Sequence, residues 1–314
     1  MSARALGLLL GYAADRVWAD PVRHHPVAWF GTVASRLEQR VWRDDRLAGT
    51  AYAAVLVGGV VLPAAGVERR AGPATRVVTT AAATWLVLGG TSLDREAAAV
   101  QARLAVDDLP GARTQVGRIV GRSTADLDAA GVARAAVESV AENTSDAVVG
   151  ALVWGAVAGL PGLLGFRAAN TLDAMVGHRT ARHDRFGWAG ARLDDVLGLP
   201  GARLTAALAA AAGPDHAGAL RAWRRDAGAH PSPNAGPVEA AFAGALGVTL
   251  GGPTTYGDRT EDRPRLGDGA APTAHDVTRA RRLAARVGLG AAVVSALIAV
   301  RAPTPPLPPR RPRR

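Results

Sequence analysis

The sequence predicts an all-α protein, a multi-pass integral membrane helical bundle with polar, soluble helical loops. The run from 147 to 166 is twenty residues long and carries no charge, which is enough to cross the ~30 Å hydrocarbon core of a bilayer. The chain has no alternating pattern of apolar and polar residues that would indicate strands. Hydrophobic residues make up 48% but aromatics only 4%, and small apolar residues favour close helix packing in lipid.

The first third of the chain predicts a helical hairpin. The apolar start, residues 5–14, is only ten residues long, and a polar stretch follows to residue 46. The runs 47–67 and 77–93 are each predicted to span the membrane. Because the connection between them is short, their outer ends are expected on the same side.

The middle of the chain predicts water-soluble helices followed by a third apolar run. Residues 94–136 place apolar residues at helical spacing among charges, and Ser123 is the expected N-cap of one of these helices. The run 147–166 contains Gly159 and Pro161, which break or kink a helix. The run therefore either crosses the membrane or turns back, and the sequence leaves both open.

The last third predicts further apolar helices separated by loops. Apolar runs lie near 199–214, 238–252 and 287–300, and a polar loop with Gly and Pro covers 256–274. Residues 1–300 are interpreted as a single membrane-embedded domain. Residues 301–314 form a Pro/Arg-rich tail, which is expected to be disordered.

Charge and composition exclude several kinds of chemistry. The chain has no cysteine and no lysine, so all 37 basic residues are arginine. This excludes thiolate metal sites, a P-loop lysine and a Schiff-base mechanism. The net charge is +10, but no basic helix carries interleaved aromatics, so we expect no nucleic-acid partner. The arginines flank apolar runs, and the positive-inside rule places the basic C-terminal tail in the cytoplasm.

A cluster of acidic residues precedes the third apolar run. On a helix Glu138, Glu142 and Asp146 stand at i, i+4 and i+8 and share one face, where like charges repel by roughly 0.2–0.5 kcal/mol per pair. A bound cation or a cationic partner would turn that cost into a site. A buried polar network that ties helices together is the structural alternative.

Several sequence blocks together resemble a known family. In chain order they are DPVRHHPV, AVESVAENTSDAVV, NTLDAMVGHR, FGWAGARLDDV, and SPNAG followed by GALGVTLGG. They resemble the CobD/CbiB family of cobalamin biosynthesis, the adenosylcobinamide-phosphate synthases, from about residue 15 to about residue 267. The chain departs from the family pattern at Ser123, Ala147 and Gly198, which puts a ligand role for Ser123 and Gly198 in doubt.

The resemblance implies an ATP-dependent amide ligation in the cell membrane. Aminopropanol, or its O-phosphate, would be joined to a propionate carboxylate of adenosylcobyric acid, giving adenosylcobinamide or its phosphate. Such a reaction needs an activated carboxylate, with magnesium and positive charge on the phosphates, and a base for the amine. The implied partners are therefore ATP, magnesium, a corrinoid, an amino alcohol, the lipid bilayer and other enzymes of the corrinoid pathway.

Mapped onto this sequence, the resemblance assigns roles to residues in and around the third run. The magnesium candidates are Glu138, Glu142 and Asp146, and the catalytic candidates are Glu142, Asn143, Asp146, Asp173 and Asp195. Asp173 or Asp195 is the candidate base, and Asn143 or Asn170 would donate to an oxyanion or to corrin amides. The candidates for substrate or phosphate binding are Asn170, His178, Arg179, Arg192, Arg203 and Asn234, and a turn is the alternative role for Asn234.

Two other functions fit part of this pattern. A transporter also places polar residues beside broken helices in the membrane, but the internal repeats typical of transporters are not visible in the sequence. A non-catalytic membrane signalling relative would keep the fold but would be expected to lose the acidic cluster, which this chain retains.

Overall fold

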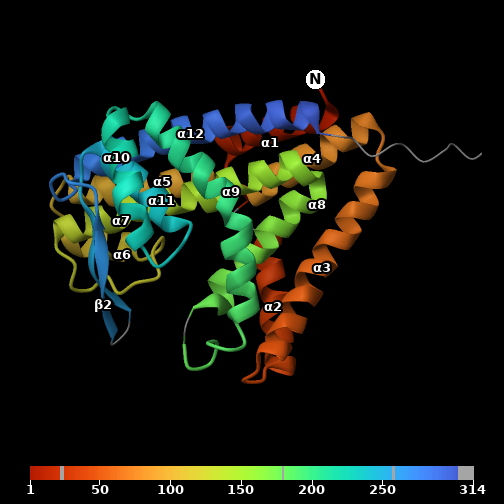
Figure 1. Cartoon of the computed structure of the whole chain (residues 1–314), viewed down its shortest axis with the longest axis horizontal. Coiled ribbons are helices and arrows are strands. Elements are labelled where there is room, and N and C mark those ends of the chain that lie inside the picture. Colours follow the sequence, from red (N-terminus) through yellow and green to blue (C-terminus); the bar gives the residue numbers. More distant parts are fainter. Residues whose placement is uncertain (22–24, 179, 257–258, 303–314) are drawn as a thin grey trace, which may run out of the picture. The chain divides into compact units, whose positions relative to one another are not determined.

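A computed structural model describes residues 1–21, 25–178, 180–256 and 259–302, and most of these residues are helical (Figure 1). The all-α prediction is therefore confirmed. The chain divides into two compact units of similar size, each built from separate stretches of sequence. Unit 1 comprises residues 1–88, 150–197 and 292–314, and unit 2 comprises residues 89–149 and 198–291.

Unit 1 contains the long helices of the first half of the chain. Its elements are α1 (Ala3–Trp18), α2 (Pro26–Val41), α3 (Arg46–Arg70), α4 (Pro73–Val87), α8 (Gly150–Leu172) and the π-helical turn η2 (Asp173–Gly177). It also holds the first turns of α9 (Trp188–Ala212) and the end of α12 (Ala274–Arg301).

Unit 2 contains shorter helices and a hairpin. Its elements are α5 (Gly90–Leu104), α6 (Leu109–Val116), α7 (Ala129–Thr144), the π-helical turn η1 (Ser145–Val149), α10 (His216–Asp226), the 3₁₀ turn η3 (Ala227–Ala229), α11 (Ala235–Leu246), β1 (Leu250–Tyr256) and β2 (Arg259–Leu266). The end of α9 and the start of α12 belong to it as well. Every residue of α11 is buried, so this short helix forms the centre of unit 2.

In the described part of the chain, three helical stretches are long and apolar enough to cross a membrane. They are Arg46–Arg70, the continuous helical stretch Ala129–Gly177, and Ala274–Arg301. The first and third cover the predicted runs 47–67 and 287–300. Much of α3 is exposed, including Val55 and Leu62, as expected for a helix with one face against lipid.

The continuous helix predicted over 77–93 is wrong. Helix α4 ends at Val87, and Leu88 has an extended conformation. The Gly89 N–H then donates to the Ala147 carbonyl, and a new helix starts at Gly90. The fifteen residues of α4 extend about 22 Å, which is short of the ~30 Å hydrocarbon core.

The run 238–252 and the loop 256–274 also differ from expectation. Helix α11 ends at Leu246 because Gly247 adopts the left-handed conformation, with φ of 65°. The chain then forms an antiparallel hairpin in which Thr255 pairs with Thr260, with an irregularity between Leu250 and Gly252. That irregularity and the glycines hide the alternation that would have indicated a strand.

Helix α8 turns back on itself within the run 147–166, and a re-entrant course of this run in the membrane stays a prediction. Gly159 has φ of 67° and ψ of −148°, so the helix breaks there. A Cβ on Gly150 would lie 2.3 Å from the Phe166 ring, whereas sixteen residues of straight helix extend about 24 Å. The two arms of α8 therefore lie against each other, and their bend is visible in Figure 1.

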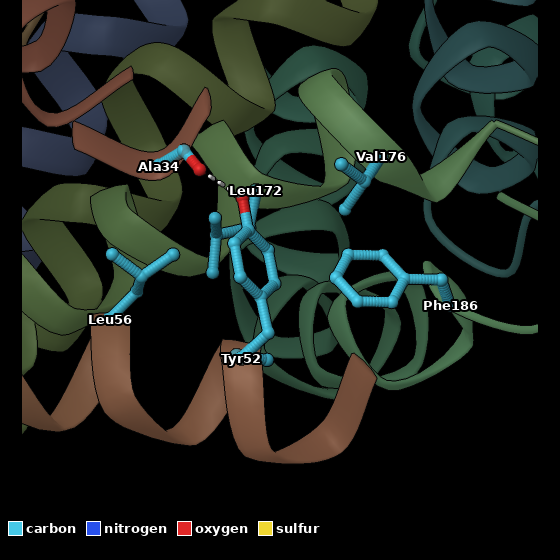
Figure 2. Close-up of a cluster of buried hydrophobic side chains, with 7 residues drawn as sticks. Ala34, Tyr52, Leu56, Leu172, Val176 and Phe186 are labelled. Carbon is cyan, nitrogen blue, oxygen red and sulfur yellow. Dashed lines mark hydrogen bonds between the residues drawn. The ribbon is translucent and has the colours of Figure 1, made fainter. Parts of the chain in front are cut away.

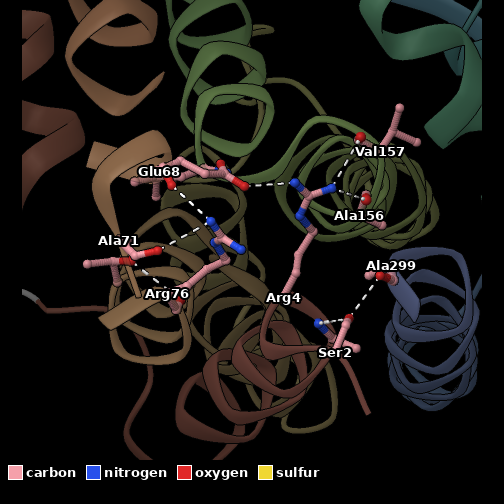
Figure 3. A network of polar contacts seen from close by, with 11 residues as sticks. Ser2, Arg4, Glu68, Ala71, Arg76, Ala156, Val157 and Ala299 are labelled. Carbon is pink, nitrogen blue, oxygen red and sulfur yellow. Dashed lines mark hydrogen bonds and ion pairs between the residues drawn. The ribbon is translucent and has the colours of Figure 1, made fainter. Parts of the chain in front are cut away.

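A buried ionic network holds this reversal in unit 1 (Figure 3). The Glu68 carboxylate pairs with the Arg4 guanidinium at 2.7 Å and accepts a hydrogen bond from the Leu160 N–H at 2.6 Å. Arg4 also donates to the Ala156 carbonyl at 3.2 Å, and Arg76 donates to the Glu68 carbonyl at 3.1 Å. Glu68 thus caps the second arm of α8 where Gly159 interrupts the helix.

A hydrophobic cluster in unit 1 packs against the first half of α3 (Figure 2). The rings of Tyr52 and Phe186 lie 5.0 Å apart, and the Tyr52 hydroxyl donates to the Ala34 carbonyl at 3.2 Å. A Cβ on Gly49 would lie 1.8 Å from the Phe186 carbonyl oxygen, so a glycine at this position lets the 180–187 segment approach α3. This packing positions the region around η2, which carries several predicted site residues.

Candidate functional site

The predicted site residues fall into two groups, one in each unit. Unit 2 holds Glu138, Glu142, Asn143, Asp146, Arg203 and Asn234, and unit 1 holds Asn170, Asp173, His178, Arg192 and Asp195. Arg179 lies outside the described residues. Each group is described by itself below.

Helix α7 positions the acidic residues of unit 2. Its N-cap is Asp128, whose side chain accepts from the Gly131 N–H at 2.7 Å. The predicted N-cap Ser123 is wrong, because its backbone N–H bonds the Thr255 carbonyl in β1 and it precedes the helix. Asp128 satisfies the orphan N–H groups at the helix start better because it immediately precedes the first turn.

Glu138 is buried, and both of its carboxylate oxygens have partners. Its side chain is 5% exposed and forms an ion pair with Arg122, which is 8% exposed. Its other oxygen accepts a hydrogen bond from the Gly251 N–H at 2.7 Å. Arg134, one turn earlier on α7, donates to the Gly251 and Pro253 carbonyls. The cationic partner expected for the acidic cluster is therefore Arg122 in the case of Glu138, and α7 is joined to β1.

Arg118 and Arg122 stand four residues apart but have different surroundings. Arg118 is 64% exposed and lies 4.0 Å from Glu96, whereas Arg122 is buried against Glu138. The segment that links α6 and α7 is not helical at these positions, so a spacing of four does not place both on one face.

Glu142 and Asp146 have different surroundings from Glu138. Glu142 is exposed and Asp146 is half-buried. Asp146 lies in the π-helical turn η1, where i→i+5 bonding changes the angular spacing assumed for a single α-helical face. Asn143 donates its amide to the Ser139 carbonyl at 2.9 Å and to the Ser139 hydroxyl at 3.1 Å.

Within the described residues, no group of three or more Asp, Glu, His or Cys side chains is arranged to hold a metal ion. The three carboxylates predicted for magnesium therefore do not form a closed protein site together. Magnesium usually takes only one or two protein carboxylates and completes its shell with water and substrate phosphates. Glu142 and Asp146, which are accessible, fit that open arrangement, and the buried Glu138 does not.

Two charged residues that the sequence analysis missed, Glu239 and Arg263, also belong to this cluster. Glu239 on α11 is 3% exposed and interacts electrostatically with Glu138, Glu142, Arg263 and Arg122. Burial raises the pKa of the Glu239 carboxyl well above its usual value, and Glu138 and Glu142 raise this pKa further. In the sequence, Glu239 is the one charged residue of the apolar run 238–252. A lone acid inside such a run was the signal that could have marked it.

The motif HPSPNAG forms a tight turn before α11. The Ser232 hydroxyl accepts from the Asn234 and Ala235 N–H groups at 3.2 and 3.1 Å. The Asn234 carbonyl oxygen accepts from Arg203 at 3.1 Å. A Cβ on Gly198 would lie 2.4 Å from the Asn234 amide nitrogen, so a larger side chain at 198 would require Asn234 to move.

The unit 1 group gathers around η2 and the start of α9. Asp173 interacts electrostatically with His178 and Asp195, and Arg192 pairs with Asp195 at 3.1 Å. Asn170 accepts from Arg167 at 3.5 Å. The chain here is α-helical to Leu172 and π-helical from Asp173 to Gly177.

The 180–187 segment is attached to α2 near this group. Glu38 binds both Arg182 and His183, at 3.0 and 3.1 Å. The Arg182 guanidinium lies over the Trp42 ring, 4.6 Å from its centroid. These contacts hold the polar segment before α9 in place without using any of the predicted site residues.

Comparison with known proteins adds a family to this geometry. The family described as "CobD/Cbib protein" matches residues 8–284. The chain is 51% identical over 302 residues to the "Cobalamin biosynthesis protein CobD" of Mycobacterium tuberculosis, covering 95% of this chain and 96% of the relative. The relative of the same description from Rhodobacter capsulatus is 46% identical, covering 88% of this chain and 90% of the relative. The one from Chromobacterium violaceum is 44% identical, covering 90% of this chain and 92% of the relative. No solved structure matches the chain.

Proposed function

Because the chain belongs to the CobD/CbiB family of cobalamin-biosynthesis proteins, we propose that it forms the amide bond between an amino alcohol and adenosylcobyric acid. The amine of aminopropanol, or of its O-phosphate, is joined to a propionate carboxylate, and ATP is consumed. The product is adenosylcobinamide or its phosphate. The observation that carries this proposal is the charged cluster of unit 2, in which Glu142 is exposed beside buried Glu138, Glu239 and Arg122.

The cluster offers the groups that such a ligation needs. Activation of the carboxylate requires phosphates held by positive charge, and the amine must lose a proton before it attacks. Glu142 and Asp146 are the carboxylates that would hold magnesium on the phosphates. Magnesium would neutralise phosphate charge during transfer. Arg203 and Asn234, joined at 3.1 Å, are the pair proposed to contact substrate at the start of α11.

The candidate base is an aspartate of unit 1. Asp173 or Asp195 is the candidate, because both are half-buried and interact with each other. Asn143 and Asn170 stay candidates for donors to an oxyanion or to corrin amides, and His178 and Arg192 stay candidates for substrate contacts. Arg179 is assigned with them from the sequence alone.

A transport function is less well supported by the broken helix. In transporters the N-terminus of a half-helix is often left open to bind substrate. Here the Glu68 carboxylate of the same chain accepts the Leu160 N–H at 2.6 Å and pairs with Arg4. The helix end at Gly159 is thus satisfied internally.

The proposal is tested by product formation. Purified, detergent-solubilised protein is given adenosylcobyric acid, ATP and magnesium, with aminopropanol in one reaction and its O-phosphate in the other. The expected result is a corrinoid whose mass corresponds to the amide, formed only when ATP is present. Absence of amide with both amines, in protein that remains folded, would reject the ligase function.

We also propose that the end of unit 1 shown in Figure 3 faces the cytoplasm. Ser2 donates to the Ala299 carbonyl at 2.8 Å, and Arg4 joins this region to Glu68 at the end of α3. Arg69, Arg70 and Arg301 lie at the same helix ends, and arginine-rich ends favour the cytoplasmic side. A C-terminal fusion to a fluorescent protein is expected to fluoresce, and an active alkaline phosphatase fusion would reverse the orientation.

A further inference from the structure

The turn before α11 holds one histidine in a fixed orientation. His230 is 8% exposed, and the Ser232 N–H donates to its Nδ1 at 3.1 Å. Pro231 and Pro233 restrict the backbone on both sides of Ser232. A Cβ on Gly236 would lie 2.9 Å from the His230 Cβ, so glycine allows α11 to pack against this residue. The imidazole is therefore oriented by its own turn before any ligand binds.

This orientation leaves a buried donor. The Ser232 carbonyl lies 3.3 Å from Nδ1, but the shorter contact is with the Ser232 N–H, which can only donate. Nδ1 is thus the acceptor, and Nε2 carries the proton. Nε2 is buried and has no hydrogen-bond partner among the residues that the structure describes. An unsatisfied buried donor is costly and calls for a partner, which a bound ligand can supply.

The charges around His230 indicate what the ligand carries. Burial lowers the pKa of His230, and Arg263 lowers this pKa further, so the ring is a neutral donor. Glu138 acts in the opposite direction but is paired with Arg122. The positive charge of Arg263 favours an acceptor with negative charge, and a phosphate oxygen accepts a hydrogen bond strongly.

We propose that the Nε2–H of His230 binds a phosphate oxygen of a substrate, carried either by ATP or by the O-phosphate of the amino alcohol. This site rests on the proposed function for the identity of the two phosphate compounds. His230 is not among the site residues that the sequence indicated. If the amino-alcohol phosphate is the source, His230 is also the residue that distinguishes the phosphorylated from the free amino alcohol.

The test is equilibrium binding by calorimetry to the full chain in detergent. The probes are ATP, aminopropanol O-phosphate and aminopropanol. His230→Asn keeps an acceptor near the position of Nδ1 but removes the donor, and His230→Gln places an amide N–H near the position of Nε2. His216→Asn is the matched control, since His216 is exposed in the same unit and its Nδ1 lies 2.6 Å from the Ala210 carbonyl oxygen.

His230→Asn is expected to weaken binding of one phosphate compound by roughly tenfold to a hundredfold, as for loss of a hydrogen bond to a charged group. The compound affected identifies the source of the phosphate. The affinity of His230→Asn for aminopropanol should stay within about threefold of the wild type, well below a tenfold loss. The affinities of His230→Gln and His216→Asn for the phosphate compounds should also stay within about threefold. Unchanged affinity of His230→Asn for both phosphate compounds, or equal losses for all three probes, would overturn the site.

A measurement on the wild type covers the case in which His230→Asn does not fold. Histidine-selective nitrogen NMR should show a change at the His230 Nε2–H when the bound phosphate compound is added, and no change at that signal overturns the site. Failure of the two proposals can be told apart. Phosphate binding through His230 without amide formation rejects the ligase, whereas amide formation with normal binding by His230→Asn rejects the site.

Discussion

Glu68 in unit 1 and Glu138 in unit 2 are held in almost the same way. Each is about 5% exposed, each pairs with a buried arginine, and each gives its second oxygen to a backbone N–H. The N–H groups belong to Leu160, which follows Gly159, and to Gly251, and both glycines have positive φ. The same arrangement thus secures an irregular backbone segment in both units.

The surroundings of the two glutamates differ, and this difference separates a structural role from a functional one. Near Glu68 the further polar partners are Arg76 and backbone carbonyls. Near Glu138 lie the exposed Glu142, the buried Glu239 and Arg263. A buried ion pair alone is weak evidence for a site. The additional titratable groups around Glu138 are what make unit 2 the better candidate for chemistry.

The two units also differ in how many large apolar side chains they expose. The described residues include 21 exposed large apolar side chains, of which only Val106, Leu220 and Leu289 belong to unit 2. Contiguous exposed apolar surface marks contact with lipid or with a partner. This distribution favours lipid contact for unit 1, and the membrane embedding of both units stays a prediction.

The largest effect is expected from Glu68→Ala. The substitution leaves the Arg4 guanidinium buried without its carboxylate, which costs about 3–5 kcal/mol of stability. Unfolding of the purified protein in detergent, followed by thermal or denaturant titration, measures this loss. Glu68→Gln, which can still accept the Leu160 N–H, should lose less. Equal stability of Glu68→Ala and wild type would show that the ionic network does not hold the reversal of α8.

Replacing an exposed apolar side chain by arginine should reduce membrane retention more in unit 1 than in unit 2. Leu62→Arg in α3, where Leu62 is 73% exposed, is expected to cost about 2.5–3.5 kcal/mol of insertion free energy near the bilayer centre. Val106→Arg, at a position equally exposed in unit 2, should change stability by no more than about 0.5 kcal/mol. The amount of each variant retained in carbonate-washed membranes reports the difference. Similar retention of both variants would contradict the assignment of lipid contact to unit 1.

Glu142→Gln is expected to lower turnover by at least about a hundredfold while the protein stays folded and membrane-inserted. Glu142 is exposed, whereas Glu68 is buried and pairs with a buried arginine, so the loss of stability should be smaller than for Glu68→Ala. Partial recovery at higher magnesium would favour a ligand role. Asp262→Asn, an exposed change on β2, is the control. Near-normal rates in both Glu142→Gln and Asp146→Asn would move the catalytic carboxylates to Asp173, Asp194 or Asp195.

The smallest effect concerns the pH dependence of Asp226 at the end of α10. Arg225 and the Gly267 N–H bind its carboxylate, and they hold the pKa of Asp226 below its usual value. A depressed folded pKa stabilises the protein above the unfolded pKa of about 3.9. Asp226→Asn should therefore lose about 1 kcal/mol at pH 7. This difference should vanish as the pH falls through the folded pKa, and a difference that persists in strong acid would point to lost packing.

The sequence predicted what depends on local pattern and missed what depends on distant contacts. Uncharged length was sufficient to find α3 and the end of α12, and the glycine and proline of the third run marked the break in α8. The end of α4 at Val87 depends on Gly89 bonding Ala147, a partner that no local pattern reveals. The hairpin after Gly247 was missed for a similar reason, because α7 holds it through Arg134 and Glu138.

The candidate site shows the same limit. The acidic cluster was visible from spacing, but its division into buried Glu138 and accessible Glu142 required the position of Arg122, which is sixteen residues away. Glu239 and His230 come from a segment about a hundred residues later in the chain. Their role could only be seen once α11 was placed in the centre of unit 2.

The reversal of α8 at Gly159 bears on how the membrane topology is measured. Gly150 and Phe166 lie side by side, so the chain between them returns to the place from which it started. If unit 1 lies in a bilayer, a hydropathy count that scores this run as one crossing predicts opposite sides for residues before 147 and after 178, whereas the reversal predicts the same side. Reporter tags at these two positions distinguish the two predictions.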